Sequence, residues 1–254
     1  MPTSTIRLIG AGLALAIGLT LGVPPAGAGT PPTADQVFVE RLYANVLGRP
    51  ATSGETGYWL QQLAAGRPRT TVAVRVAGSR EGRGVLITRL YDHAFDFDRV
   101  PSAAERDYWV GRLAAGRSVE AVWADVTLSP EVHQVGGGAY FPDTNVGQAL
   151  HFYAFYLSRL PVTEPPEAME GVNYWADRIA ADPSSRGVHR TALAFGRSRD
   201  ATTTGLGRGW VPACAGLQSL TPAQSWTLTA TWAAARHDLV RLAAVAVAVV
   251  CPTG

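Results

Sequence analysis

The sequence predicts an all-α protein made of tandem helical units followed by a C-terminal helix. Residues 51–81 align without a gap with residues 101–131, which indicates an internal repeat. Within the aligned stretch, apolar residues lie three and four positions apart, and capping residues precede the apolar runs. Alternating runs typical of β-strands are scarce, apart from a Val- and Ala-rich stretch at 243–250.

Each unit is predicted to contain a leading helix, a loop with proline, a Tyr-Trp helix, a glycine stop and a third helix ending near Ser-x-Glu. Leading helices are predicted within 38–50 and 85–101. A looser third copy follows at 150–161, 172–182 and 189–200, so the sequence predicts about three repeats of a three-helix unit. Capping boxes are predicted for Thr33 with Gln36, Thr52 with Glu55, and Ser102 with Glu105.

The segments "GYWLQQLAAGR" (57–67) and "DYWVGRLAAGR" (107–117) are the middle helices of the first two copies. Trp and Leu lie four apart on one helical face, and a glycine stands where a left-handed C-cap ends each helix. The repeated aromatic residues are expected in the core, with any polar tip directed outward. The residues that carry the repeat are Tyr43, Tyr58, Trp59 and Gly66, then Tyr91, Tyr108, Trp109 and Gly116, then Tyr174 and Trp175. Of the aromatic residues, those outside the repeat are the better candidates for ligand contact: Trp123, Trp210, Trp226 and Trp232.

The N-terminus indicates export. Arg7 precedes an apolar run at 8–23, and Ala26-Gly27-Ala28 fits the small-x-small rule for cleavage after Ala28. An uncleaved anchor remains an alternative, although the apolar run is shorter than the ~20 residues that span a bilayer. The predicted location is therefore secreted or extracellular, with attachment to the cell surface left open.

The two cysteines, Cys214 and Cys251, are predicted to form a disulfide, because an even pair in an exported protein usually does so. The apolar run at 239–250 is short and contains Arg241, which favours a buried capping helix closed by this disulfide over a membrane span. The predicted organisation is a signal peptide at 1–28, units at 29–84, 85–138 and 139–204, and a linker with the capping helix at 205–254.

The repeat signature resembles the DUF4214 family. The resemblance rests on "LYANVLGRP", "YWLQQLAAG" and "LSPEV", and covers roughly residues 35–200. The third copy departs from the pattern, since Asp182 replaces the glycine stop and "VTEPPEAMEG" lengthens the loop. The resemblance implies a bacterial, helical, often tandem module of exported or surface proteins, similar in fold to phycobilisome linker domains. That family has no assigned activity, so it transfers no catalytic residue and no cofactor.

The best candidate for cation binding is the acidic segment 91–99, which contains Asp92, Asp96 and Asp98 beside His93. It lacks the spacing of a calcium-binding loop, and Phe95 and Phe97 alternate with the acids, so the favoured interpretation is a polar loop with two core anchors. The five histidines lack zinc-binding spacing. The glycine-rich "GSREGRG" (78–84) is expected to form a turn between units.

No catalytic residue or cofactor is predicted, and the expected function is a non-catalytic interaction module that binds glycan or protein of the cell envelope. Glu55 and Glu105 are explained as capping-box partners. The alternative is an extracellular hydrolase of cell-wall polymer that uses acids such as Asp96, Asp98 or Glu105 in a groove between units. All 22 basic residues are arginines, yet they are scattered and the net charge is only +2, which argues against nucleic-acid binding.

Overall fold

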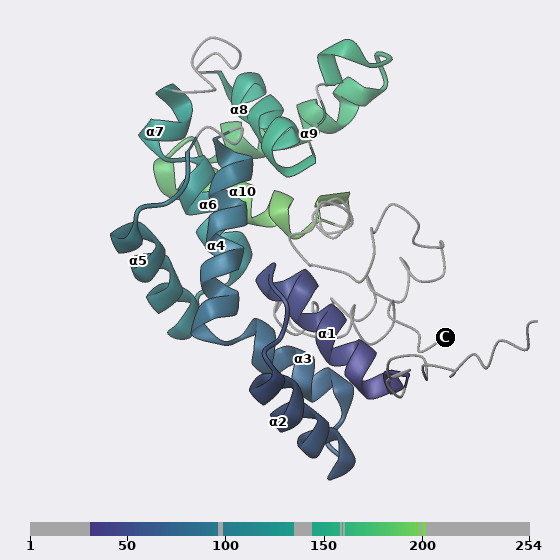
Figure 1. The fold of residues 1–254 in the computed structure, drawn as a ribbon. Helices are drawn as coiled ribbons and strands as arrows, with labels where there is room; N and C mark the ends of the chain where they lie inside the picture. The colour runs from purple at the N-terminus through teal and green to yellow at the C-terminus, as the bar shows by residue number, and fades with distance from the viewer. Residues whose placement is uncertain are drawn as a thin grey trace, which may run out of the picture. The chain divides into compact units, whose positions relative to one another are not determined.

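Helices joined by short loops make up the described part of the chain (Figure 1). The structure, a computed structural model, describes residues 31–95, 99–134, 144–157, 159, 161–198 and 200–201. Within these residues there is no β-strand, so the predicted all-α class is confirmed. None of the described helices is long and apolar enough to cross a membrane.

The first three helices enclose one apolar cluster. α1 (Ala34–Leu47) packs against α2 (Ser53–Ala64) and α3 (Arg69–Ala77). The buried residues of this cluster are Phe38, Val39, Leu42, Tyr43, Val46, Leu47, Trp59, Val72, Ala73 and Val76. On α1 these residues recur three and four positions apart, which is the spacing of one helical face.

Two of the three predicted capping boxes form completely. The side chains of Thr52 and Ser102 each accept a hydrogen bond from the backbone three residues later, and the glutamate at that position returns one. At the start of α1 the box is half formed. The Thr33 hydroxyl accepts from the Gln36 backbone, but the Gln36 side chain donates to Glu40.

The predicted glycine stops are confirmed. Gly66 and Gly116 have φ values of 83° and 90°, which only glycine adopts without strain. At the first stop, the N–H of Gly66 donates to the carbonyl of Leu63, and that of Arg67 donates to the carbonyl of Gln62. This pair of bonds satisfies the last carbonyls of α2 and turns the chain towards α3.

The prediction that residues 78–84 form a turn between units is wrong. Most of these residues form the first turn of α4 (Arg80–Ala94). Ser79 caps this helix by accepting from the N–H of Gly82. Gly82 allows the end of α3 to lie against α4, since a Cβ there would lie 2.5 Å from the carbonyl oxygen of Ala77. The boundary expected between residues 84 and 85 falls inside α4.

A second apolar cluster begins on α4 and continues to the end of the described chain. α4 packs against α5 (Ala103–Ala114) and α6 (Val119–Thr127), and α6 packs against α10 (Ser185–Gly196). The short α7 (Pro130–Val132) follows α6. Trp123, Tyr156, Phe152 and Phe195 are the largest fully buried side chains of this cluster.

The last described helices depart from the regular pattern. α8 (Asn145–Phe152) passes directly into a π-helical turn, η2 (Tyr153–Leu157), and the short η3 (Pro161–Thr163) follows. α8 and η3 both pack against α9 (Ala168–Ala181), and α9 packs against α10. Where the glycine stop is missing, Asp182 ends α9, and its carboxylate accepts from the Ser184 hydroxyl at 2.6 Å.

Several predictions concern residues outside the described part of the chain. These are the signal peptide at 1–28, the Cys214–Cys251 disulfide and the capping helix at 239–250. They stay predictions.

Candidate functional site

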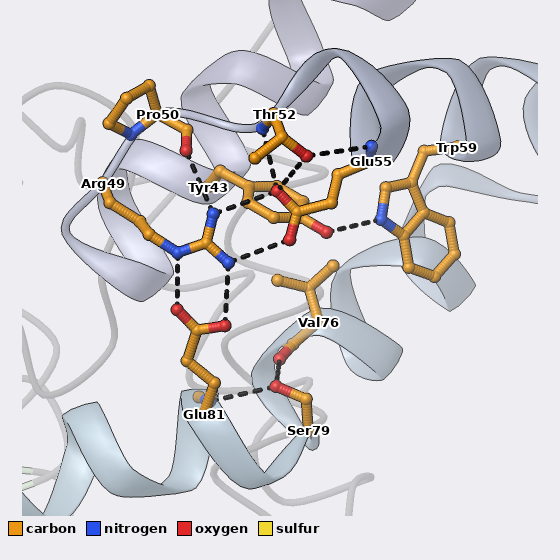
Figure 2. A network of polar contacts seen from close by, with 10 residues as sticks. Tyr43, Arg49, Pro50, Thr52, Glu55, Trp59, Val76, Ser79 and Glu81 are labelled. Carbon is orange, nitrogen blue, oxygen red and sulfur yellow. Dashed lines mark hydrogen bonds and ion pairs between the residues drawn. The ribbon is translucent and has the colours of Figure 1, made fainter.

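Arg49 lies between two carboxylates that come from different helices (Figure 2). Gly48, with a φ of 70°, ends α1 and turns the chain so that Arg49 faces the starts of α2 and α4. The guanidinium donates to Glu55 at 2.9 and 3.0 Å and to Glu81 at 2.6 and 2.8 Å. We call Arg49, Glu55 and Glu81 the Arg49 clamp. It joins the loop after α1 to the first turns of α2 and α4.

An aromatic pair lies directly behind the Arg49 clamp. The indole N–H of Trp59 donates to the hydroxyl of Tyr43 at 2.9 Å, and both side chains are buried. The guanidinium carbon of Arg49 lies 5.3 Å from the centre of the Tyr43 ring, which is within the range of a cation–π contact. The repeated Tyr and Trp residues therefore connect the polar clamp to the apolar cluster.

The same contacts occur around Arg99. Its guanidinium bonds Glu105 and Glu131, each at 2.5 Å, and we call these three residues the Arg99 clamp. The indole N–H of Trp109 donates to the Tyr91 hydroxyl at 3.0 Å, and Arg99 lies 5.1 Å from the centre of the Tyr91 ring. Every residue of the first arrangement thus has a counterpart in the second.

Both capping-box glutamates are held ionised. Hydrogen bonds from Arg49, and then from the Thr52 backbone, lower the pKa of Glu55 to about 2. Hydrogen bonds from Arg99, and then from Ser102, lower the pKa of Glu105 to about 2. Because a carboxyl with such a pKa carries no proton near neutral pH, neither is suited to general-acid catalysis. The bonds of Glu105 to Arg99 and Ser102 explain its presence as a structural residue.

The third predicted unit, at 139–204, also has an arginine after its leading helix, but this arginine has a different partner. Arg159 follows Tyr153 at the same spacing by which Arg49 follows Tyr43. Its guanidinium bonds Glu164, and this contact is the main cause that raises the pKa of Arg159, with a further contribution from the charge of Asp200. Trp175 packs against Phe195 with ring centres 5.0 Å apart.

The tyrosine of each Tyr-Trp pair is exposed, whereas its tryptophan faces inward. Tyr58, Tyr108 and Tyr174 are 48%, 57% and 55% exposed. Each ring meets its neighbouring tryptophan edge to face, with ring centres 4.8, 4.8 and 5.1 Å apart. The expected core position is therefore wrong for these three tyrosines. Adjacent helical residues are rotated by about 100°, so burial of the tryptophan directs the tyrosine to solvent.

The proposed role of Trp123 is also wrong. Trp123 is completely buried, and its ring stacks against His93 with centres 5.6 Å apart. It belongs to the second apolar cluster and offers no surface to a ligand. Trp210, Trp226 and Trp232 lie outside the described residues, so they stay candidates.

The structure brings no cation site together among the residues it describes. No group of three or more His, Cys, Asp or Glu side chains with metal-binding geometry occurs in that part of the chain. Asp92 lies on the last turns of α4, while Asp96 and Asp98 lie outside the described residues. Phe95 is buried, as predicted for a core anchor of this segment.

A pocket of about 800 Å³ lies along α4, beside α5 and the end of α1. Its lining includes Gly48, Gly84, Val85, Thr88 and Val110, and several charged side chains of α4 and α5. Arg80 pairs with Asp107 at 2.9 Å in this lining. Sequence reasoning missed this pocket, because it depends on how α4 and α5 pack and its residues belong to no repeated motif.

A histidine and an acid also meet outside this pocket. His189 on α10 lies 2.8 Å from Asp125 on α6, and Arg117 pairs with the same carboxylate. The contact spans 64 residues in the sequence, and no short motif signals it. It joins two helices that already pack together, which explains it as a structural contact.

Comparison with known proteins gives a family match. Residues 28–86 match the family model described as "Domain of unknown function (DUF4214)". The match runs into α4 and includes the complete Arg49 clamp. No curated protein and no solved structure matches the chain.

Proposed function

Starting from a DUF4214 domain over residues 28–86, we propose that this chain is an exported, non-catalytic interaction module that binds glycan of the cell envelope. Its helical units would form a rigid support, and the exposed tyrosine of each unit would contact the sugar. Support for export comes from the N-terminal segment 1–28, with its positive residue, apolar run and small-x-small site.

The proposed support consists of about three related units. The Arg49 and Arg99 clamps have the same partners in the same order, and each has a Tyr-Trp hydrogen bond behind it. Each clamp joins a loop to the helix that follows it and to the start of a later helix, so it limits how far the unit can deform. A binding surface built on such units would change little between free and bound states.

The observation that carries the glycan proposal is the position of Tyr58, Tyr108 and Tyr174. All three occupy the same place in their units and remain about half exposed. A tyrosine ring offers a flat apolar face and a hydroxyl, and the face suits the C–H surface of a sugar ring. Packing against the neighbouring tryptophan holds each ring in place, so little side-chain entropy would be lost on binding.

A hydrolase receives less support from the geometry. Its mechanism would need a carboxyl that holds a proton near neutral pH, and the pKa of Glu105 is lowered to about 2. Asp96 and Asp98 lie outside the described residues. The interaction module is therefore the function that we propose.

The proposal is tested by co-sedimentation of the secreted chain with purified, insoluble cell-wall polysaccharide. A triple variant, Y58A/Y108A/Y174A, should lose most of the bound fraction, because all three ring faces are removed. The matched control is Y58F/Y108F/Y174F, which keeps the rings and should keep binding. Equal sedimentation of the alanine variant and the wild type would contradict the proposal.

A further inference from the structure

The pocket along α4 has the dimensions of a site for an extended ligand. Its lining runs from Arg80 to Asp92, about three turns of helix or ~18 Å at 1.5 Å per residue. Gly84 and Gly48 leave part of the wall without side chains. Most of the other lining residues are polar or charged, although carbon atoms supply most of the exposed wall, so the pocket suits a ligand that carries both C–H surface and charged or polar groups.

Three of the six charged side chains that line the pocket form ion pairs, and the other three are Arg89, Asp92 and Arg106. Glu81 is bound by Arg49, and Asp107 is bound by Arg80. These pairs neutralise one another and leave little reason for either carboxylate to attract a cation. The electrostatic character of the pocket is therefore decided by its other charged residues.

Among the residues that the structure describes, two arginines of the pocket have no carboxylate partner. Within the described residues, no Asp or Glu oxygen lies within 4.0 Å of a guanidinium nitrogen of Arg89 or Arg106. Arg89 is half-buried and donates one hydrogen bond, to the carbonyl oxygen of Asn45 at 2.9 Å. Arg106 extends from α5 over Gly84, where its Cδ lies 3.6 Å from the position a Cβ would take.

The position of Arg89 favours an anionic ligand over solvent. Burial lowers the pKa of Arg89, while the nearby charge of Asp92 opposes that effect. The backbone bond to Asn45 fixes the direction of the guanidinium, so the N–H groups that have no partner among the described residues keep a set orientation. Planar guanidinium groups bind carboxylates with two parallel hydrogen bonds, which adds both strength and geometric selectivity.

We propose that this pocket binds the carboxylate of an acidic saccharide, with Arg89 and Arg106 as its ligands. Further along the same wall, Asp92 and the Thr88 hydroxyl, which donates its own hydrogen to the Gly84 carbonyl at 3.1 Å, would accept hydrogen bonds from sugar hydroxyl groups. This inference rests on the proposed glycan function and gives it a substrate class, a uronic-acid-containing chain. The site is lined by the end of α1, by α4 and by α5, and neither Arg89 nor Arg106 takes part in the Arg49 or Arg99 clamp.

The test is calorimetric titration of the secreted full-length chain with trigalacturonic acid and with its methyl ester, which has the same sugar rings without charge. The acid should bind, and the methyl ester should bind at least about tenfold more weakly, the effect of losing one charge-assisted hydrogen bond. Equal affinity for the acid and the ester would overturn the proposal, and so would the absence of any heat of binding with the acid.

Two substitutions on α5 distinguish binding in the pocket from a general effect of positive surface charge. R106Q removes a pocket guanidinium that is exposed and unpaired in the described structure, so it should leave the melting temperature unchanged and weaken binding of the acid about tenfold. R112Q removes an exposed arginine of the same helix that does not line the pocket, and it should bind like the wild type. Equal losses in both variants would contradict the site.

The result can be distinguished from failure of the broader proposal. If the pocket is wrong and glycan binding is right, R106Q will bind trigalacturonic acid like the wild type, while Y58A/Y108A/Y174A will fail to sediment with neutral polysaccharide. If glycan binding itself is wrong, the wild type will bind neither neutral polysaccharide nor trigalacturonic acid.

Discussion

Removal of Arg49 is expected to destabilise the protein far more than removal of a surface arginine of the same charge. The substitution R49M keeps the length of the side chain and removes the guanidinium. It breaks four hydrogen bonds to Glu55 and Glu81 and the contact with the Tyr43 ring. It also leaves two carboxylates facing each other without the cation between them.

The size of the effect follows from the exposure of the clamp. The side chains of Arg49, Glu55 and Glu81 are 35%, 31% and 45% exposed, so solvent screens each ion pair substantially. Each of the two screened ion pairs and the cation–π contact contributes a modest stabilisation. For a chain of this size their combined loss lowers the melting temperature by about 3–12 °C.

The matched control is R80M. Arg80 pairs with Asp107, but their side chains are 78% and 53% exposed, so this variant should lose less than about 0.5 kcal/mol. Both variants are compared by thermal unfolding followed by circular dichroism at neutral pH. If R49M and R80M melt within about 1 °C of each other, the clamp does not stabilise the fold and the reasoning fails.

Three further predictions use the same assay. G84A should stabilise the protein by about 0.5–1 kcal/mol, because α4 has room for a Cβ at this position. G82A should destabilise it, because the added Cβ clashes with the Ala77 carbonyl, and a change of the same sign in both variants would contradict this reasoning. W59F should lower the free energy of unfolding by about 1–2 kcal/mol, because it leaves the Tyr43 hydroxyl without its hydrogen-bond donor. Y58F, at the exposed neighbouring residue, should leave stability unchanged, and equal losses in the two variants would argue against the buried hydrogen bond. Burial, then the charge of His133, lowers the pKa of His151 to about 4, so the unfolded chain binds this proton more tightly than the folded chain. Stability should therefore fall as pH falls from about 6.5 to about 4, with roughly 3 kcal/mol of the fall due to His151. H151Q should lose this share and keep the smaller fall below about pH 5 that Glu55 and Glu105 cause; an unchanged slope in H151Q would contradict the assignment.

Local signals predicted the helix ends, because the contacts that end a helix lie within a few residues of one another. Thr52 and Glu55 are three residues apart, and the stop at Gly66 depends on its own φ and on carbonyls of the preceding turn. The buried position of Trp59 followed from helical spacing. The same spacing also directs Tyr58 to solvent, and that consequence could have been drawn from the sequence.

Contacts between distant segments escaped prediction. Arg49 and Glu81 are 32 residues apart, and their contact depends on how α4 packs beside the loop after α1. The glycines at the start of α4 suggest a turn when taken alone. Packing against the end of α3 requires a residue without a side chain at Gly82, so the helix keeps a glycine there despite its low helix propensity.

The central claim is that the exposed tyrosines bind glycan while the repeated clamps hold the fold. It is tested most directly by one binding isotherm of the secreted chain on purified cell-wall polysaccharide, measured for the wild type and for Y58A/Y108A/Y174A, with melting curves on the same samples. We predict at least about a tenfold loss of affinity in a variant that still melts in a cooperative transition, with a melting temperature lowered only by the loss of the three edge-to-face contacts. Unchanged affinity in the alanine variant would contradict the account.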